Sequence, residues 1–183
     1  GIIECKEIFA KLLKVPTKNV IVCGNSSLNM MFDYITQCML TGSGAEPWKD
    51  QGEIKFLCPC PGYDRHFAIA EYYGIKLIPV KMNNDGPDMN AVEEMIKDEK
   101  VKGMFCVPKY SNPTGCTYSD DTVRRLASMQ CGAPDFRIMW DNAYCVHEFE
   151  GEFVPFRDII SLCAEAGRPN MVYEFASTSK ITF

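Results

Sequence analysis

Residues 136–144 read FRIMWDNAY, in which a mostly apolar run from Phe136 to Trp140 is followed directly by the polar residues Asp141 and Asn142. A short apolar run that ends at polar turn residues is typical of a buried strand. The same pattern recurs along the whole chain. We therefore expect six strands, over residues 20–23, 54–58, 76–81, 102–108, 136–140 and 171–175.

Helical patterns separate these strands. After the first strand, Leu28, Met31, Phe32, Ile35 and Met39 form an apolar stripe with helical spacing. Further helices are expected over 67–73, from Asp88 through Ile96, from Ser119 to before Gly132, and over 156–166. This alternation predicts an α/β fold, a mostly parallel sheet between two layers of helices. In such sheets ligands bind beyond the carboxyl ends of the strands.

The composition is that of an ordinary globular protein. Of the 183 residues, 46% are hydrophobic and 23% are charged, and the formal net charge is −5. We find no basic block for nucleic acid and no apolar run long enough to cross a membrane. The first nine residues carry Glu4, Lys6 and Glu7, so we expect no signal peptide. Ten scattered cysteines, several within apolar runs, favour free thiols in a cytoplasmic protein.

Polar clusters follow five of the expected strands. They are Gly24-Asn25-Ser26-Ser27, Pro61-Gly62-Tyr63-Asp64-Arg65-His66, Asn112-Pro113-Thr114-Gly115, Asp141-Asn142-Ala143-Tyr144 and Ser177-Thr178-Ser179-Lys180. Taken singly, each is an ordinary turn, helix start or surface lysine. Cys58-x-Cys60 with His66 does not have the spacing of a zinc site, so we expect no metal.

In this order and spacing, the clusters resemble the class I aminotransferases, which are fold-type I pyridoxal-phosphate enzymes, and in particular a divergent bacterial branch similar to aspartate aminotransferase. The resemblance runs from about Val20 to Lys180. It implies that residues 1–183 are part of the large, cofactor-binding domain. The last strand of the sheet and a small C-terminal domain would lie outside this chain. It also implies a homodimer for the intact protein.

The resemblance implies three catalytic residues. Lys180 would hold pyridoxal phosphate as an internal aldimine and move the α-proton of the substrate. Asp141 would keep the pyridine nitrogen of the cofactor protonated. Tyr144, with Asn112, would donate hydrogen bonds to the phenolate oxygen of the cofactor.

The remaining cofactor-binding residues follow from the same resemblance. A phosphate group needs backbone donors and hydroxyls at a helix N-terminus, which Asn25, Ser26 and Ser27 provide together with Ser177. Tyr63 would stack on the pyridine ring, and His66 would support the aspartate. Ser179 is the last of the residues that the resemblance assigns to cofactor binding.

The expected reaction transfers the amino group of an amino acid, with aspartate preferred, to a 2-oxo acid such as 2-oxoglutarate. Three alternatives remain open. The same cofactor also serves carbon–sulfur lyases. Some transcription regulators carry an aminotransferase-like domain that senses an effector. The 183-residue piece could also be inactive as it stands.

Overall fold

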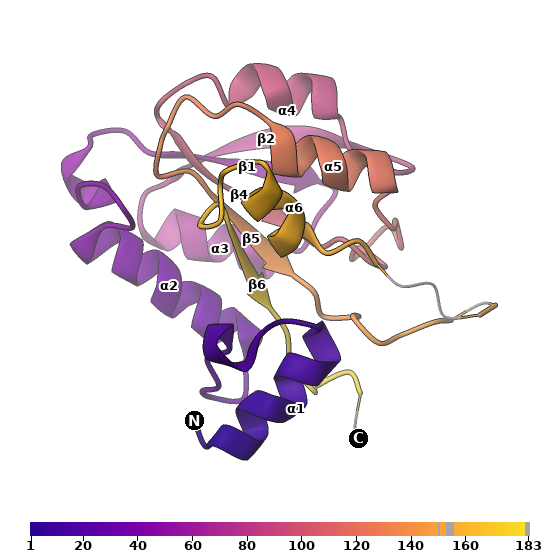
Figure 1. The fold of residues 1–183 in the computed structure, drawn as a ribbon. Helices are drawn as coiled ribbons and strands as arrows, with labels where there is room; N and C mark the ends of the chain where they lie inside the picture. Colours follow the sequence, from indigo (N-terminus) through magenta and orange to yellow (C-terminus); the bar gives the residue numbers. More distant parts are fainter. Residues whose placement is uncertain (150, 153–155, 182–183) are drawn as a thin grey trace.

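The computed structural model describes residues 1–149, 151–152 and 156–181 (Figure 1). A six-stranded sheet, with strand order β3-β2-β1-β4-β5-β6, forms its centre. Every neighbouring pair is parallel except β2 and β3, so the predicted α/β fold with a mostly parallel sheet is confirmed. The strands are β1 (Lys55–Cys60), β2 (Lys76–Asn83), β3 (Gly86–Pro87), β4 (Val101–Cys106), β5 (Arg137–Asp141) and β6 (Val172–Phe175).

Helices cover both faces of this sheet (Figure 1). One face packs against α2 (Ser27–Thr41) and α3 (Asp64–Tyr72). The other packs against α4 (Met89–Met95), α5 (Asp120–Ser128) and α6 (Ile159–Glu165). The described chain therefore has the three layers that the alternation of strands and helices predicted.

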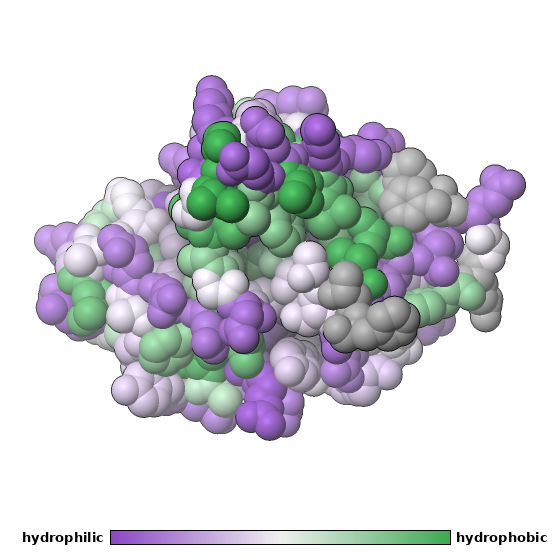
Figure 2. All heavy atoms as spheres, turned by 90° about the horizontal axis from the view of Figure 1, so that it is seen from below, coloured by the Kyte–Doolittle hydropathy of each residue, from purple (hydrophilic) through white to green (hydrophobic). Residues whose placement is uncertain are grey.

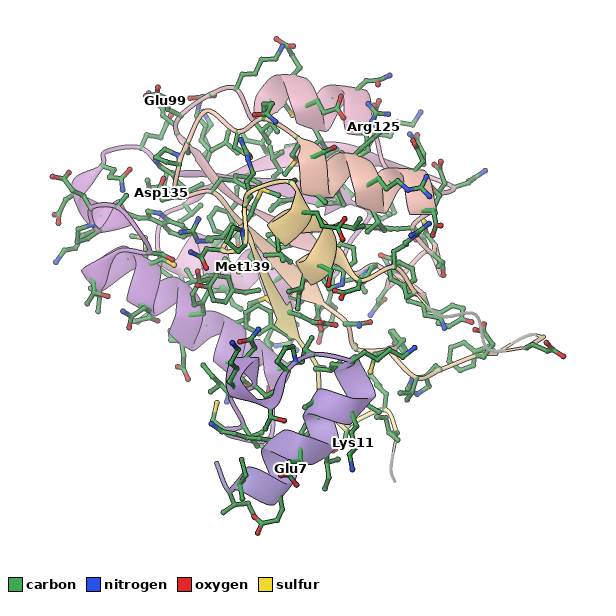
Figure 3. All side chains as sticks on the ribbon, viewed as in Figure 1. Glu7, Lys11, Glu99, Arg125, Asp135 and Met139 are labelled. Atoms are coloured by element: carbon green, nitrogen blue, oxygen red, sulfur yellow. The ribbon has the colours of Figure 1, made fainter. Side chains whose placement is uncertain are left out.

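Successive residues of each strand face opposite layers, because the side chains of a strand alternate. Ile138 packs in the core beneath α4, α5 and α6. Its neighbour Met139 lies between the sheet and α2, as Figure 3 shows. Gly103 of β4 is needed for close packing, because a Cβ there would lie 2.4 Å from the ring of Phe56.

Most expected elements are present, with boundaries shifted by a few residues. Strand β1 continues through Pro59 to Cys60, two residues beyond the expected end at residue 58. Pairing with β4 stops at Leu57, so the missing N–H of Pro59 interrupts no ladder on that side. Helix α3 begins three residues earlier than expected and α6 three residues later. Asp88 and Ser119 cap α4 and α5, as predicted.

The prediction of a strand over residues 20–23 is wrong. These residues pair with no strand of the described chain, and Ile21 is 76% exposed. Ile21 and Val22 instead line a pocket of about 410 Å³ together with Glu174 and Phe175 of β6. An apolar run alone does not form a strand, because its backbone needs a partner.

Helix α1 (Ile3–Leu13) was not expected from the sequence. It lies beyond the carboxyl end of β6, outside the three layers (Figure 1), and buries only Ala10. Ile2, Ile3 and Ile8 are more than half exposed. Figure 2 looks onto this end of the molecule and shows apolar side chains gathered beside a hollow. Within the described residues, no helix is long and apolar enough to span a bilayer.

Candidate active site

A pocket of about 230 Å³ opens at the carboxyl ends of β4, β5 and β6. Ten of the eleven residues singled out in the sequence lie around it, although they come from five separate segments. Leu28, Val107 and Ala143 add apolar walls that the motifs did not indicate. The full lining is Asn25, Ser26, Ser27, Leu28, Tyr63, Val107, Asn112, Asp141, Ala143, Tyr144, Ser177, Ser179 and Lys180.

The eleventh residue, His66, lies behind the pocket and contacts it through Asp141. Its Nε2 donates a hydrogen bond to Asp141 Oδ2 at 2.8 Å. His66 is 1% exposed, and its ring stacks on Phe105 with centroids 5.2 Å apart. Packing therefore fixes the imidazole, and the imidazole fixes the carboxylate.

Asp141 has a second carboxylate oxygen that needs a partner. The residue ends β5 and is 7% exposed. Its Oδ1 is buried and makes no hydrogen bond within the described residues. A buried carboxylate oxygen left without a donor is costly. The pocket therefore suits a group that presents an N–H, and best a cationic one, at this point.

The N-terminus of α2 forms the opposite side of the pocket. Ser26 is the N-cap, and its hydroxyl accepts a hydrogen bond from the backbone N–H of Asn29 at 3.4 Å. Gly24 has φ of +33°, a conformation that favours glycine, and turns the chain into the helix. The free N–H groups and the dipole of this 15-residue helix suit an anion.

Tyr144 and Lys180 meet at the pocket from different segments. The Lys180 Nζ lies 6.0 Å from the centre of the Tyr144 ring. Lys180 itself is exposed in this chain, at the turn that follows β6. Tyr63 lines the pocket with its ring edge-on to His66, the centroids 5.1 Å apart. Asn112 is exposed and begins the turn closed by the bridge between Ser111 and Cys116.

A second polar cluster, which the motifs did not indicate, lies beside this pocket. Lys109 is 5% exposed, donates to the carbonyl of His147 and forms an ion pair with Glu148 at 3.1 Å. The hydroxyl of Tyr110 donates to the same carboxylate. A buried lysine such as Lys109 needs a charged partner, and this need was the signal that the sequence offered. The partner, Glu148, is 39 residues away in the sequence, so the signal did not identify it.

Glu174 of β6 is another residue that sequence reasoning missed. Burial raises the pKa of its carboxyl to about 7. Asn142 donates a hydrogen bond to Glu174 Oε1 at 2.6 Å, which partly offsets the effect of burial on this pKa. Among the residues that the structure describes, no cluster of three or more histidine, cysteine or acidic side chains could hold a metal ion.

The layered sheet and the polar pocket at its strand ends are those of the large domain of a fold-type I transferase. Residues 1–183 match the family model described as aspartate amino-transferase. The chain belongs to the aspartate aminotransferase family, which confirms the resemblance seen in the motifs.

Sequence and structural similarity to individual relatives support membership of this family. The chain is 50% identical to the aspartate aminotransferase of Corynebacterium glutamicum, over 100% of the chain and 43% of that protein. A crystal structure of an aspartate transaminase from C. glutamicum superposes with a TM-score of 0.95 at 49% identity, covering 100% of this chain and 43% of the other. The chain thus spans less than half the length of these relatives.

A more distant structure shares the fold alone. LysN, an α-aminoadipate aminotransferase from Thermus thermophilus, has a TM-score of 0.78 at 22% identity, over 99% of this chain and 42% of its own. That protein was solved in complex with N-(5'-phosphopyridoxyl)-L-leucine.

Proposed function

We propose that the whole protein is a pyridoxal-phosphate-dependent aminotransferase, in which residues 1–183 form part of the large domain beside a small C-terminal domain. It would transfer the amino group of an amino acid, aspartate being preferred, to a 2-oxo acid such as 2-oxoglutarate. The observation that carries the proposal is the buried, unpartnered Oδ1 of Asp141 in a pocket lined by the predicted residues. The 50% identity to an aspartate aminotransferase supports the choice of substrate.

The pocket residues fit pyridoxal phosphate. When bound, this group supplies an electron sink for the charge left when a substrate loses its α-proton. Asp141 Oδ1 would accept a hydrogen bond from the pyridine N–H, and His66 would hold the carboxylate in place. The N-terminus of α2, with Asn25, Ser26 and Ser27, would bind the phosphate, assisted by Ser177 and Ser179.

The remaining side chains would act at the reacting end. The Lys180 amine is the nucleophile that would anchor the group and then take and return the α-proton. Tyr144 and Asn112 would donate hydrogen bonds to the ring oxygen, where they stabilise negative charge. The Tyr63 ring would cover one face of the pyridine and keep it oriented.

The resemblance extends the proposal to the assembly and its location. We place the whole protein in the cytoplasm as a homodimer. All ten cysteines are free thiols, which fits a reducing compartment.

Covalent trapping tests the cofactor assignment. The whole protein is mixed with pyridoxal phosphate, reduced with borohydride and digested for peptide mapping. We expect a phosphopyridoxyl group on Lys180 and none on the Lys180→Arg variant, which keeps the charge but lacks the nucleophile. A wild-type protein without an adduct at Lys180 would overturn the proposal.

Product analysis then tests the reaction. Aspartate and 2-oxoglutarate should give glutamate only when both are present. Pyruvate and ammonia from a cysteine conjugate, without any acceptor acid, would identify a carbon–sulfur lyase instead. Cofactor binding without turnover of any amino-acid and oxo-acid pair would favour an effector-sensing domain.

A further inference from the structure

His147 joins two residues of the candidate site that are far apart in the sequence. Its Nε2 lies 2.7 Å from the backbone carbonyl oxygen of Lys180. Its ring packs edge-on against Tyr144, with centroids 5.5 Å apart and planes at 79°. None of the motifs in the sequence includes this histidine.

The contact with Lys180 shows which ring nitrogen of His147 acts as a donor. A carbonyl oxygen only accepts hydrogen bonds, so Nε2 must carry the hydrogen. Nδ1 is buried and has no partner within the described residues. Among those residues, the bond to Lys180 is therefore the hydrogen bond that holds the ring.

The backbone of His147 is itself held by a contact with Lys109. Lys109, at the carboxyl end of β4, donates to the His147 carbonyl and pairs with the neighbouring Glu148. Lys109 is 5% exposed, so water competes little for these contacts. The segment is thus anchored to the sheet, and His147 reaches from it to a turn that is exposed.

We propose that His147 is a positioning residue for Lys180: its Nε2–H fixes the turn that carries the lysine. The proposal rests on the proposed function of Lys180. Within the described residues, the turn is closed by a backbone hydrogen bond from Ile181 N–H to the carbonyl of Thr178 at 2.9 Å. The bond from His147 adds a tie to the rest of the protein. Lys180 then projects from a fixed backbone, so less freedom is lost when its amine reaches the reacting atom.

Three substitutions separate the hydrogen bond from the packing. Gln places its amide N–H where His carries Nε2, whereas Asn places it at Nδ1 and falls short of Lys180. Phe keeps the ring against Tyr144 but has no donor. His147→Gln should therefore behave like the wild type, and both His147→Asn and His147→Phe should release the turn.

Hydrogen exchange of the whole protein without added cofactor measures this release. One net hydrogen bond is worth about 1 kcal/mol, so we expect the Ile181 amide to exchange about fivefold faster in His147→Asn and His147→Phe. His147→Gln should restore slow exchange. Peptides from β4 should be unaffected and report that each variant is folded. Unchanged exchange at Ile181 in both the Asn and Phe variants would overturn the proposal.

Kinetics of the cofactor-loaded protein give an independent test. We expect kcat to fall about tenfold in the Asn and Phe variants, with KM for the amino acid unchanged, and Gln to recover the rate. A general structural defect would not be rescued by Gln alone. Equal loss of rate in all three variants would contradict a role for the Nε2 bond. Failure to trap Lys180 in the wild type would instead refute the proposed function, and the exchange comparison would still decide whether His147 holds the turn.

Discussion

At the scale of single residues, the environment of Asp141 decides what the pocket can bind. Its two carboxylate oxygens have different surroundings: Oδ2 receives a hydrogen bond from His66, and Oδ1 lies buried without a partner in the described chain. The hydrogen bond to Oδ2 orients the Asp141 carboxylate, and Oδ1 is left to bind a ligand. This division of roles is common where a side chain must hold one geometry.

Asp141→Asn tests this assignment, because it keeps the shape of the side chain and removes the charge. We expect weaker binding of pyridoxal phosphate and aminotransfer slower by about a hundredfold or more, as is usual when a preorganised electrostatic contact is lost. Cofactor titration and steady-state rates of the whole protein measure both effects. Asp98→Asn, which removes an exposed carboxylate paired with Lys55, is the control. A fully active Asp141→Asn protein would contradict the assigned role.

At the scale of elements, helix α2 is a support for the sheet and a side of the pocket at once. Met31, Ile35 and Cys38 bury one face of it against the sheet. That packing aims its N-terminus, capped by Ser26, at the candidate site. Helix α5 has the same kind of cap, Ser119, whose hydroxyl accepts from Thr122 N–H at 3.2 Å, but it does not line this pocket.

The two caps form a matched pair of variants. Ser26→Ala and Ser119→Ala should each lower the free energy of unfolding by about 1 kcal/mol, because each leaves a helix N–H without its acceptor. Only Ser26→Ala should also weaken the binding of pyridoxal phosphate. Urea unfolding and cofactor titration separate the two effects. If both variants lose cofactor affinity equally, the α2 terminus has no special part in binding the phosphate.

Elements with local signals could be predicted from the sequence. Residues 136–140 are apolar except for Arg137 and end at a polar turn, and Asp88 and Ser119 are good N-caps. Residues 20–23 show the limit of this reasoning, since their backbone has no neighbouring strand in the described chain. Helix α1 was missed although Ile8, Phe9 and Leu12 have helical spacing; it lies outside the three layers and buries only Ala10.

The candidate site was largely predictable for a different reason. In a parallel sheet the residues after each strand meet at one edge, so motifs such as Asn112-Pro113 and Asp141-Asn142 converge without any local signal linking them. The tie from His147 to Lys180 could not be predicted. It joins residues 33 positions apart and depends on how two turns pack.

At the scale of the whole molecule, the fold partly buries an ionisable group, Glu174, that the proposed chemistry does not use. Glu174 lies on β6, between the pocket near α1 and the segment that leads into α6. Burial is the main reason that its pKa is raised to about 7, with a further contribution from Asp158. The folded state therefore keeps its proton at pH values at which the unfolded chain releases it.

This difference makes the stability of the fold depend on pH. A pKa raised from 4.5 to about 7 means that stability falls as pH rises through this range and is constant above it. Glu174→Gln removes the penalty, so the variant should exceed the wild type by roughly 3 kcal/mol at pH 8 and by little at pH 4.5. Urea unfolding of the whole protein at both pH values measures the difference. Glu165→Gln, an exposed change on α6, controls for the loss of one charge. Equal stabilisation by Glu174→Gln at both pH values would show that packing of the amide, rather than removal of a buried ionisable group, accounts for the effect.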